Sequence, residues 1–213
     1  YRAAAVSFQN LLIDYPDVDG SEDIQYKIVE SYYKYAEQSI VKRQQERYEE
    51  TIIAAENFLS RHDDSQFIDL VKETEEQAHL DAIESSYNLA MNYIVEKRLD
   101  KLEEVRNVYE VHLMDITTDK KRKAAADVLE QSYFQIIKTN FEHAQESLVE
   151  KRKPLYDATI EAYYNFNQKY NTSKYTKEAN RLFNASEKNL KKLRSSLRFR
   201  IAMALPFLVL LIC

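Results

Sequence analysis

"YEETIIAAENFLSRHDDSQF", residues 48–67, is repeated in altered form as "YDATIEAYYNFNQKYNTSKY" at residues 156–175, 108 residues further on. A shift of half that length, 54 residues, places ESYYKYAEQSIVKR (30–43) on ESSYNLAMNYIVEK (84–97). A second shift of 54 residues reaches KTNFEHAQESLVEK (138–151). The chain therefore carries three copies of one unit.

The match between the first and third copies exceeds chance. Residues 26–72 align with residues 134–180 without a gap and share 11 identities, where average residue usage would give about 3. Self-similarity at a fixed period is typical of solenoids, in which each unit buries its apolar face only against its neighbours.

Each copy is expected to form two helices. In the first copy one helix carries a single apolar stripe, formed by Ile28, Tyr32, Tyr35, Ala36 and Ile40. The other helix begins near Tyr48 and gathers its apolar residues on one side, at Ile52, Ala55, Phe58 and Leu59. Two positions keep their character in all three copies and are predicted to be core: Ala36, Ala90 and Ala144, and Ile40, Ile94 and Leu148.

Short polar breaks separate the helices, at residues 61–65, 115–119 and 169–173. Ser65 and Ser173 coincide in the alignment and are expected to be N-caps, because a serine oxygen accepts hydrogen bonds from the free N–H groups at a helix start. Residues 65–98 and 119–152 contain no Pro or Gly. Each stretch would form a helix of roughly 50 Å if unbroken, so we expect a kink or a short break in at least one.

The opening residues refine the repeat type. In YRAAAVSFQNLLIDYPD (1–17), a small residue, two apolar residues and a terminating proline match the second half of the tetratricopeptide pattern, at Ala4, Phe8, Leu11 and Pro16. Pro16 ends the helix because its ring cannot continue it. The chain begins inside this helix, so we expect an N-terminally truncated fragment, with any signal peptide upstream.

Composition favours helices throughout. One glycine and three prolines leave almost no turn punctuation for a sheet, and strong helix formers dominate. We predict an all-α fold, a right-handed α-solenoid of about seven helices in tetratricopeptide-like hairpins, with repeats lengthened to about 54 residues. The predicted parts are a truncated unit 1–25, the full units 26–79, 80–133 and 134–187, and a tail, 188–213.

No recognisable catalytic or cofactor motif occurs in the sequence. One glycine excludes a glycine-rich phosphate loop. Glu76 and His79 have the spacing of a di-iron ligand pair, but one repeat later stand Glu130 and Tyr133. We therefore expect no catalytic residue, no cofactor and no metal. A net charge of −5 with interspersed signs gives no field that would draw nucleic acid, and a single cysteine, Cys213, excludes an internal disulfide.

The tail joins a basic stretch, 188–200, to 13 largely apolar residues, 201–213. As a helix the apolar part would reach about 20 Å, short of the roughly 30 Å hydrocarbon core of a bilayer, and Pro206 interrupts it. Three interpretations stay open: an error of gene calling or assembly, a segment that lies on a membrane surface, and a buried capping strand or helix.

The sequence AAVSFQNLLIDYPD (4–17), followed by YKIVESYYKYAEQSIVKRQQERYEETIIAAENFLSRH (26–62), resembles the C-terminal half of BamD-type outer-membrane assembly lipoproteins in the form found in Bacteroidota. The shared features are the aromatic SYYKYAEQSI, the basic linker VKRQQERY and the second helix ERYEETI…NF. The resemblance covers residues 1–79 and extends over residues 134–190.

This resemblance implies a non-catalytic scaffold at the periplasmic face of the outer membrane, in the cell envelope. The family is tethered by an N-terminal lipid, which would lie outside this fragment, and it docks onto the periplasmic domains of the BamA-like barrel insertase. The C-terminal tail is a second candidate membrane contact. The alternative is a general tetratricopeptide-like adapter for protein–protein interaction outside that machinery. An enzyme would need a pocket of convergent polar groups that the sequence does not supply.

Differences between the copies indicate where a protein partner would bind. Tyr32 and Tyr35 are replaced by other residue types in both later copies, so the repeat itself requires neither aromatic. An aromatic side chain next to cations is a frequent hot spot of protein interfaces. We predict that Tyr32, Tyr35, Arg43 and Arg47 are part of a protein-binding patch.

Overall fold

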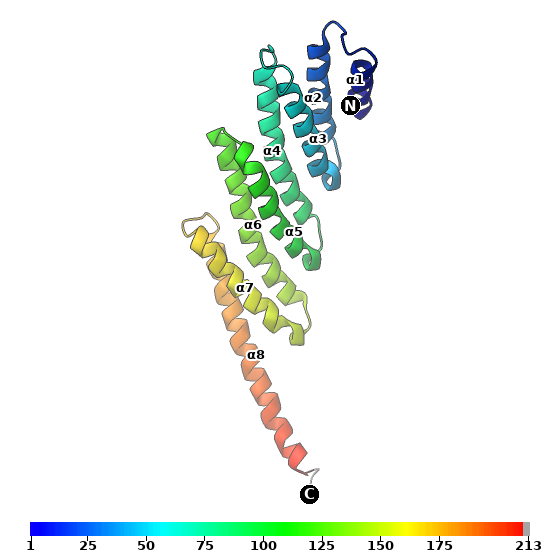
Figure 1. The fold of residues 1–213 in the computed structure, drawn as a ribbon. Coiled ribbons are helices and arrows are strands. Elements are labelled where there is room, and N and C mark those ends of the chain that lie inside the picture. Colours follow the sequence, from blue (N-terminus) through cyan, green and yellow to red (C-terminus); the bar gives the residue numbers. More distant parts are fainter. Residues whose placement is uncertain (211–213) are drawn as a thin grey trace. The chain divides into compact units, whose positions relative to one another are not determined.

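The structure is a computed structural model that describes the backbone of residues 1–210 and the side chains of residues 1–195. Within these residues it consists of helices and their connecting loops, without a β-strand (Figure 1). In chain order the helices are α1 (Arg2–Asp14), α2 (Ser21–Glu37), α3 (Val41–Leu59), α4 (Ile68–Met91), α5 (Val95–His112), the short 3-10 turn η1 (Leu113–Asp115), α6 (Asp119–Glu146), α7 (Val149–Lys169) and α8 (Thr176–Leu210).

Successive helices pair into hairpins, and this confirms the predicted all-α helical-repeat solenoid (Figure 1). The described part of the chain holds eight α-helices, one more than expected, because residues 176–210 form a long eighth helix, α8. The two stretches expected to form long helices are both interrupted: α4 ends at Met91 and α6 ends at Glu146. The predicted break is therefore confirmed.

The chain divides into two compact units. One contains Tyr1–Tyr93 and Asp100–Leu129, and the other contains Ile94–Leu99 and the chain from Glu130 onward. In the first unit α2 packs against α1, α3 and α4, and α3 packs against α4. In the second unit α7 packs against α8.

The period of the sequence is visible in the second helix of each hairpin. The helices α3, α5 and α7 begin at Val41, Val95 and Val149, each 54 residues after the one before. The expected repeat boundaries near residues 26, 80 and 134 lie inside α2, α4 and α6. The 54-residue spacing is thus kept by the turns within the hairpins, whereas the first helices do not start at a constant spacing.

Two stacked aromatic pairs explain the similarity of residues 48–67 and 156–175. Both segments end in an aromatic residue at the entry to the next helix. Phe67 stacks on Tyr26 with ring centroids 4.5 Å apart, and Tyr175 stacks on Phe134 with centroids 4.6 Å apart. Such offset contacts contribute about 0.5–1.5 kcal/mol beyond the burial of the rings. The same contact therefore recurs in the first and third copies.

The cores of the first and third hairpins each contain an alanine at the same repeat position. Ala36 clusters with Tyr48 and Ala82, and at the equivalent positions of the third copy Ala144 clusters with Tyr156 and Leu190. The three alanines at this position, Ala36, Ala90 and Ala144, are all 0% exposed, so the prediction that they are core is confirmed.

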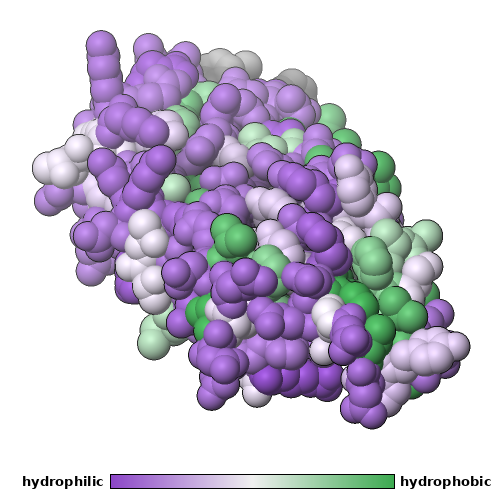
Figure 2. Space-filling view, turned by 90° about the horizontal axis from the view of Figure 1, so that it is seen from above, coloured by the Kyte–Doolittle hydropathy of each residue, from purple (hydrophilic) through white to green (hydrophobic). Residues whose placement is uncertain are grey.

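The second predicted core position is wrong. Ile40 is 70% exposed, Ile94 is 63% exposed and Leu148 is 71% exposed. Each of them lies in the turn just before the second helix of a hairpin. The backbone of Ile40 and Leu148 is extended there, so these residues no longer continue the apolar stripe of the first helix. The view from above shows a mostly hydrophilic surface with apolar side chains gathered at one side (Figure 2).

Ser65 and Ser173 begin the turns that lead into α4 and α8, but the residues at the helix N-cap of α4 and just before α8 are Phe67 and Tyr175. The Phe67 N–H donates to Ser65 Oγ (3.0 Å) and the Tyr175 N–H donates to Ser173 Oγ (2.9 Å). The prediction that Ser65 and Ser173 are N-caps is therefore wrong: each serine accepts a backbone hydrogen bond within the turn, and the helix begins three residues after it.

The backbone of α8 continues through most of the predicted tail, to Leu210. The interpretations of the apolar run 201–213 concern side chains that lie outside the described residues. Among the residues that the structure does describe, no helix combines the length and the apolar character needed to cross a bilayer.

Substitutions at the two repeated positions should separate packing from exposure. Ala36→Leu would force extra methylenes into a fully buried contact with Tyr48, and we expect it to lower the free energy of unfolding by about 1–3 kcal/mol. Ile40→Ser, four residues away in an exposed turn, should not lower it, because serine at this N-cap position can bond the free N–H groups of α3. Urea unfolding of the two variants measures both values, and equal losses would contradict the assignment.

Candidate protein-binding surface

The turns inside the three hairpins share one backbone geometry. In each turn, the carbonyl of the exposed aliphatic residue accepts a hydrogen bond from the N–H of the residue three positions later. The distances are 2.8 Å from Arg43 to Ile40, 3.0 Å from Lys97 to Ile94 and 2.9 Å from Lys151 to Leu148. We call these six residues the turn motif, an aliphatic side chain followed three residues later by a cation.

Helix capping does not explain the aliphatic side chains of the turn motif. Ile40 and Leu148 are the N-cap residues of α3 and α7, and neither helix has a side-chain cap hydrogen bond. Ser, Thr, Asp and Asn are preferred at this position because they bond the free N–H groups of the first turn. An aliphatic residue that is exposed and gives no cap contributes little to folding, so its recurrence needs another explanation.

The cations of the turn motif are available to a partner. Lys97 and Lys151 have no ion-pair partner within the described residues. Arg43 pairs with Glu46 at 2.6 Å, but both side chains are more than half exposed, and such pairs contribute little. The cations also lie at helix N-termini, which carry partial positive charge. Each turn thus presents an exposed apolar side chain near a cation, and Glu96 and Glu150 stand beside the lysines of the second and third turns.

Donor side chains in the first turn of the second helices hold the turns together. Arg152 donates to the carbonyls of Ser147 (2.8 Å) and Gln145 (3.3 Å), at the end of α6. Gln44, its equivalent in the first copy, donates to the carbonyl of Glu37 (3.4 Å), at the end of α2. A donor at this position satisfies carbonyl groups that the ending helix leaves free.

The four residues predicted to form a binding patch are brought together only in part. The Arg47 guanidinium lies 4.0 Å from the centre of the Tyr35 ring and also donates to Ser39 Oγ. Tyr32 instead donates to Gln9 Oε1 of α1 (3.2 Å). Arg43 belongs to the turn motif. The binding role of Tyr32, Tyr35, Arg43 and Arg47 stays a prediction.

Sequence reasoning missed the aliphatic half of the turn motif. The signal was present as IVKR, IVEK and LVEK at residues 40–43, 94–97 and 148–151. Retention of an apolar residue was interpreted as core packing, although a residue retained in every copy can equally face solvent at a repeated surface.

Glu76, one of the two residues with the spacing of di-iron ligands, has a structural role. Its carboxylate accepts hydrogen bonds from the N–H of Thr117 (2.6 Å) and of Thr118 (2.5 Å), just before α6, and pairs with Lys121 at 3.1 Å. Burial alone would raise the pKa of Glu76, but the hydrogen bonds from Thr118, Lys121 and Thr117 outweigh it and lower the pKa to about 2. Glu76 therefore fastens α4 to the start of α6.

His79 and His112 form a buried pair in the first unit. Their Nδ1 atoms are 2.9 Å apart, so one neutral ring donates to the other. The Asp115 carboxylate lies 4.0 Å from His79 Nε2. Burial lowers the pKa of both imidazoles, with the neighbouring His112 adding to the effect on His79. Among the described residues, no three potential ligands are arranged to hold a metal ion.

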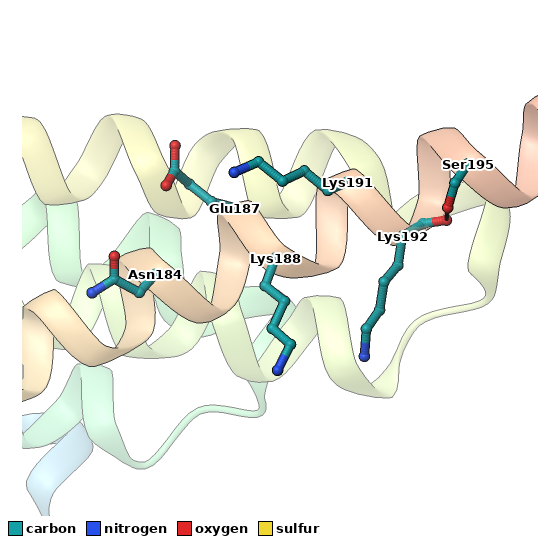
Figure 3. Close-up of a pocket in the computed structure, with 6 residues that line it drawn as sticks. All are labelled: Asn184, Glu187, Lys188, Lys191, Lys192 and Ser195. Atoms are coloured by element: carbon teal, nitrogen blue, oxygen red, sulfur yellow. Dashed lines mark hydrogen bonds between the residues drawn. The ribbon is translucent and has the colours of Figure 1, made fainter.

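A shallow hollow on α8 carries three exposed lysines, Lys188, Lys191 and Lys192 (Figure 3). Its lining residues all belong to α8, and the only hydrogen bond drawn among them joins Ser195 Oγ to the carbonyl of Lys192 (2.8 Å). The Lys188 and Lys192 side chains point to one side of the helix, and Lys191 points to the other (Figure 3). Because the lysines belong to one exposed helix and point apart, they do not enclose a ligand.

The fold and this surface define a helical-repeat protein. No family model matches the chain, and no curated protein matches it either. Solved structures that match include a protein described as "Computational Design of Self-Assembling Cyclic Protein Homooligomers", 14% identical over 92% of this chain and 84% of that chain, with a TM-score of 0.33. Another is described as "DHF58 filament", 11% identical over 93% of this chain and 94% of that chain, with a TM-score of 0.34. Likenesses this distant carry no functional argument.

The role of Glu76 predicts a pH dependence of stability. Its folded pKa lies below the ordinary 4.5, so its stabilisation is present above pH 4.5 and is lost as the pH falls toward 2. Glu76→Gln should lower the free energy of unfolding at pH 7 by roughly 3 kcal/mol, and the gap from the wild type should close in acid. Urea unfolding from neutral to acid pH measures it. Glu103→Gln, at an exposed site, is the control, and an equal loss in that variant would contradict the role.

The histidine pair predicts a second pH dependence of the free energy of unfolding. The folded chain resists protonation of His79 and His112, so stability is full above their unfolded pKa near 6.5 and declines as the pH falls below it. Replacing the pair with the residues of the first copy, as His79→Gln with His112→Phe, should remove this decline. The quantity to follow by urea unfolding is the difference in free energy between wild type and variant from about pH 7.5 to 5. A difference that stays constant would show that the pair does not titrate.

Proposed function

We propose that the protein is a non-catalytic scaffold that binds protein partners through the turns of its hairpins. The turn motif carries this proposal. Ile40, Ile94 and Leu148 are large aliphatic side chains that remain exposed in every copy, and neither core packing nor helix capping accounts for them. Protein interfaces have an apolar centre and a polar rim, and each turn offers an exposed apolar side chain with a cation three residues further on.

The machinery in which this scaffold acts follows from the resemblance of residues 1–79 to BamD-type lipoproteins. We propose a periplasmic subunit of the outer-membrane β-barrel assembly machinery, tethered by an N-terminal lipid and docked on a BamA-like barrel insertase. The exposed turns would contact acidic and apolar surface on that partner. The turn motif indicates an interaction but no particular partner. Taken without the resemblance, it therefore favours the alternative function, a tetratricopeptide-like adapter outside this machinery.

Recovery of partners from the native cell envelope tests the proposal. We expect the complete, affinity-tagged protein to recover the barrel insertase in mild detergent. Serine at Ile40, Ile94 and Leu148 together should lower that recovery at least tenfold, which corresponds to about 1.4 kcal/mol or more of lost binding free energy. The thermal unfolding midpoint should not fall, because serine can cap α3 and α7. Quantitative mass spectrometry of the recovered proteins provides the measurement.

The control carries serine at Ile53, Leu70 and Val111, three exposed aliphatic residues outside the turns. It should recover the insertase as well as the wild type does. Recovery of other envelope proteins without the insertase would favour the adapter. Equal recovery of the insertase by both triple variants would show that the turn motif is not part of the interface.

A further inference from the structure

A hollow of about 500 Å³ lies between α1, α2 and α3 in the first unit. Its floor is apolar and includes Ile28 and Phe58, and its rim carries the carboxamides of Gln9, Gln25 and Asn57. The volume lies in the range of ligand-binding clefts, roughly 300–1,000 Å³. We call this hollow the α1–α3 groove.

In the later copies the side chains at the equivalent positions contact one another. Gln25, Phe58 and Arg61 of the groove correspond to His79, His112 and Asp115 in the second copy and to Tyr133, Phe166 and Lys169 in the third. His79 and His112 bond each other and are buried. Lys169 lies over the Tyr133 ring, with its Nζ 5.0 Å from the ring centre.

In the first copy, as the structure describes it, Gln25 and Arg61 make no contact of this kind. Gln25 turns to His62, with Oε1 2.8 Å from His62 Nε2. The Arg61 guanidinium is exposed and has no side-chain partner within the described residues. The groove is thus the one member of this repeated position that combines an apolar floor with an uncommitted cation.

The free hydrogen-bonding groups of the rim suit a polypeptide backbone. The oxygens of Gln9 and Gln25 are engaged by Tyr32 (3.2 Å) and His62 (2.8 Å), so their NH₂ groups remain as donors. The NH₂ group of Asn57 donates to the carbonyl of Ile53 (2.8 Å), so its oxygen remains as an acceptor. Donors and acceptors at the edge of an apolar floor match the alternating N–H and C=O groups of an extended chain.

We infer that the α1–α3 groove binds an extended peptide segment of a partner protein, which places one or two apolar side chains on the floor and a carboxylate side chain against Arg61. The inference rests on the proposed scaffold function, but it concerns a site separate from the turn motif. The carboxylate follows from charge complementarity, since a guanidinium without a partner recognises a carboxylate by paired hydrogen bonds.

Selection from a displayed library of random dodecapeptides tests the groove, with the complete protein as the target. The recovered peptides should combine apolar residues with a nearby Asp or Glu. Asn57→Trp, which fills the groove from its exposed rim, should lower their binding at least tenfold. The matched control is Asn165→Trp, an exposed position 108 residues later on α7, and it should leave binding unchanged.

Charge reversal gives a second readout that does not depend on the shape of the groove. Selection on Arg61→Glu should recover Lys or Arg in place of Asp or Glu, whereas selection on Lys120→Glu, an exposed lysine elsewhere, should not. Circular dichroism melting establishes that each variant is folded. Failure to select any peptide, or peptides that bind Asn57→Trp as tightly as the wild type, would overturn the inference.

The two proposals fail separately. Peptides that bind the groove should also bind the triple serine variant of the turn motif, because the sites are distinct. Loss of peptide binding with recovery of the insertase intact would leave the scaffold proposal standing without the groove. Peptide binding without recovery of the insertase would leave the groove standing and favour the adapter.

Discussion

The first and third hairpins depend on the contact between an alanine of the first helix and a large side chain of the second. Ala36 meets Tyr48, and Ala144 meets Tyr156. A methyl group lets the two helices approach closely, while the tyrosine supplies most of the apolar area that the contact buries. The next helix then adds a residue to the same cluster, Ala82 in one case and Leu190 in the other. Propagation of the repeat follows from this three-helix contact.

Around that constant core, one group of neighbouring side chains differs between the three copies. The position of Phe58 becomes His112 and then Phe166, and its neighbours change with it. A repeat protein can vary such a position because each unit contacts only its neighbours, so that a local change is not transmitted along the array. In the second copy the result is a buried histidine pair, and in the first it is an open groove. Functional differences between copies are therefore expected at positions that the shared core does not constrain.

The fold was predictable because the repeat is written in residue types that only helices favour, and because an alanine kept in three copies has no plausible surface role. The exposure of Ile40 was not predictable by periodicity. An aliphatic residue at the end of a stripe fits the core pattern equally well, and its place in the turn depends on where α2 ends. The carboxylate of Glu76 was also beyond sequence reasoning, since its partners Thr117 and Thr118 lie 41 and 42 residues away. The groove depends on the absence of a contact, which no local pattern records.

The central claim is that the repeat keeps one position for packing and another for partner binding. A scan of every substitution at Ala36, Ala90 and Ala144 and at Ile40, Ile94 and Leu148 tests it most directly, if cellular abundance and growth of the host are read in parallel. The account predicts that larger residues at the alanines lower both abundance and growth. Polar or acidic residues at the aliphatic positions should leave abundance unchanged and lower growth. If abundance falls at both sets alike, the aliphatic residues serve the fold, and the binding role assigned to the turns is wrong.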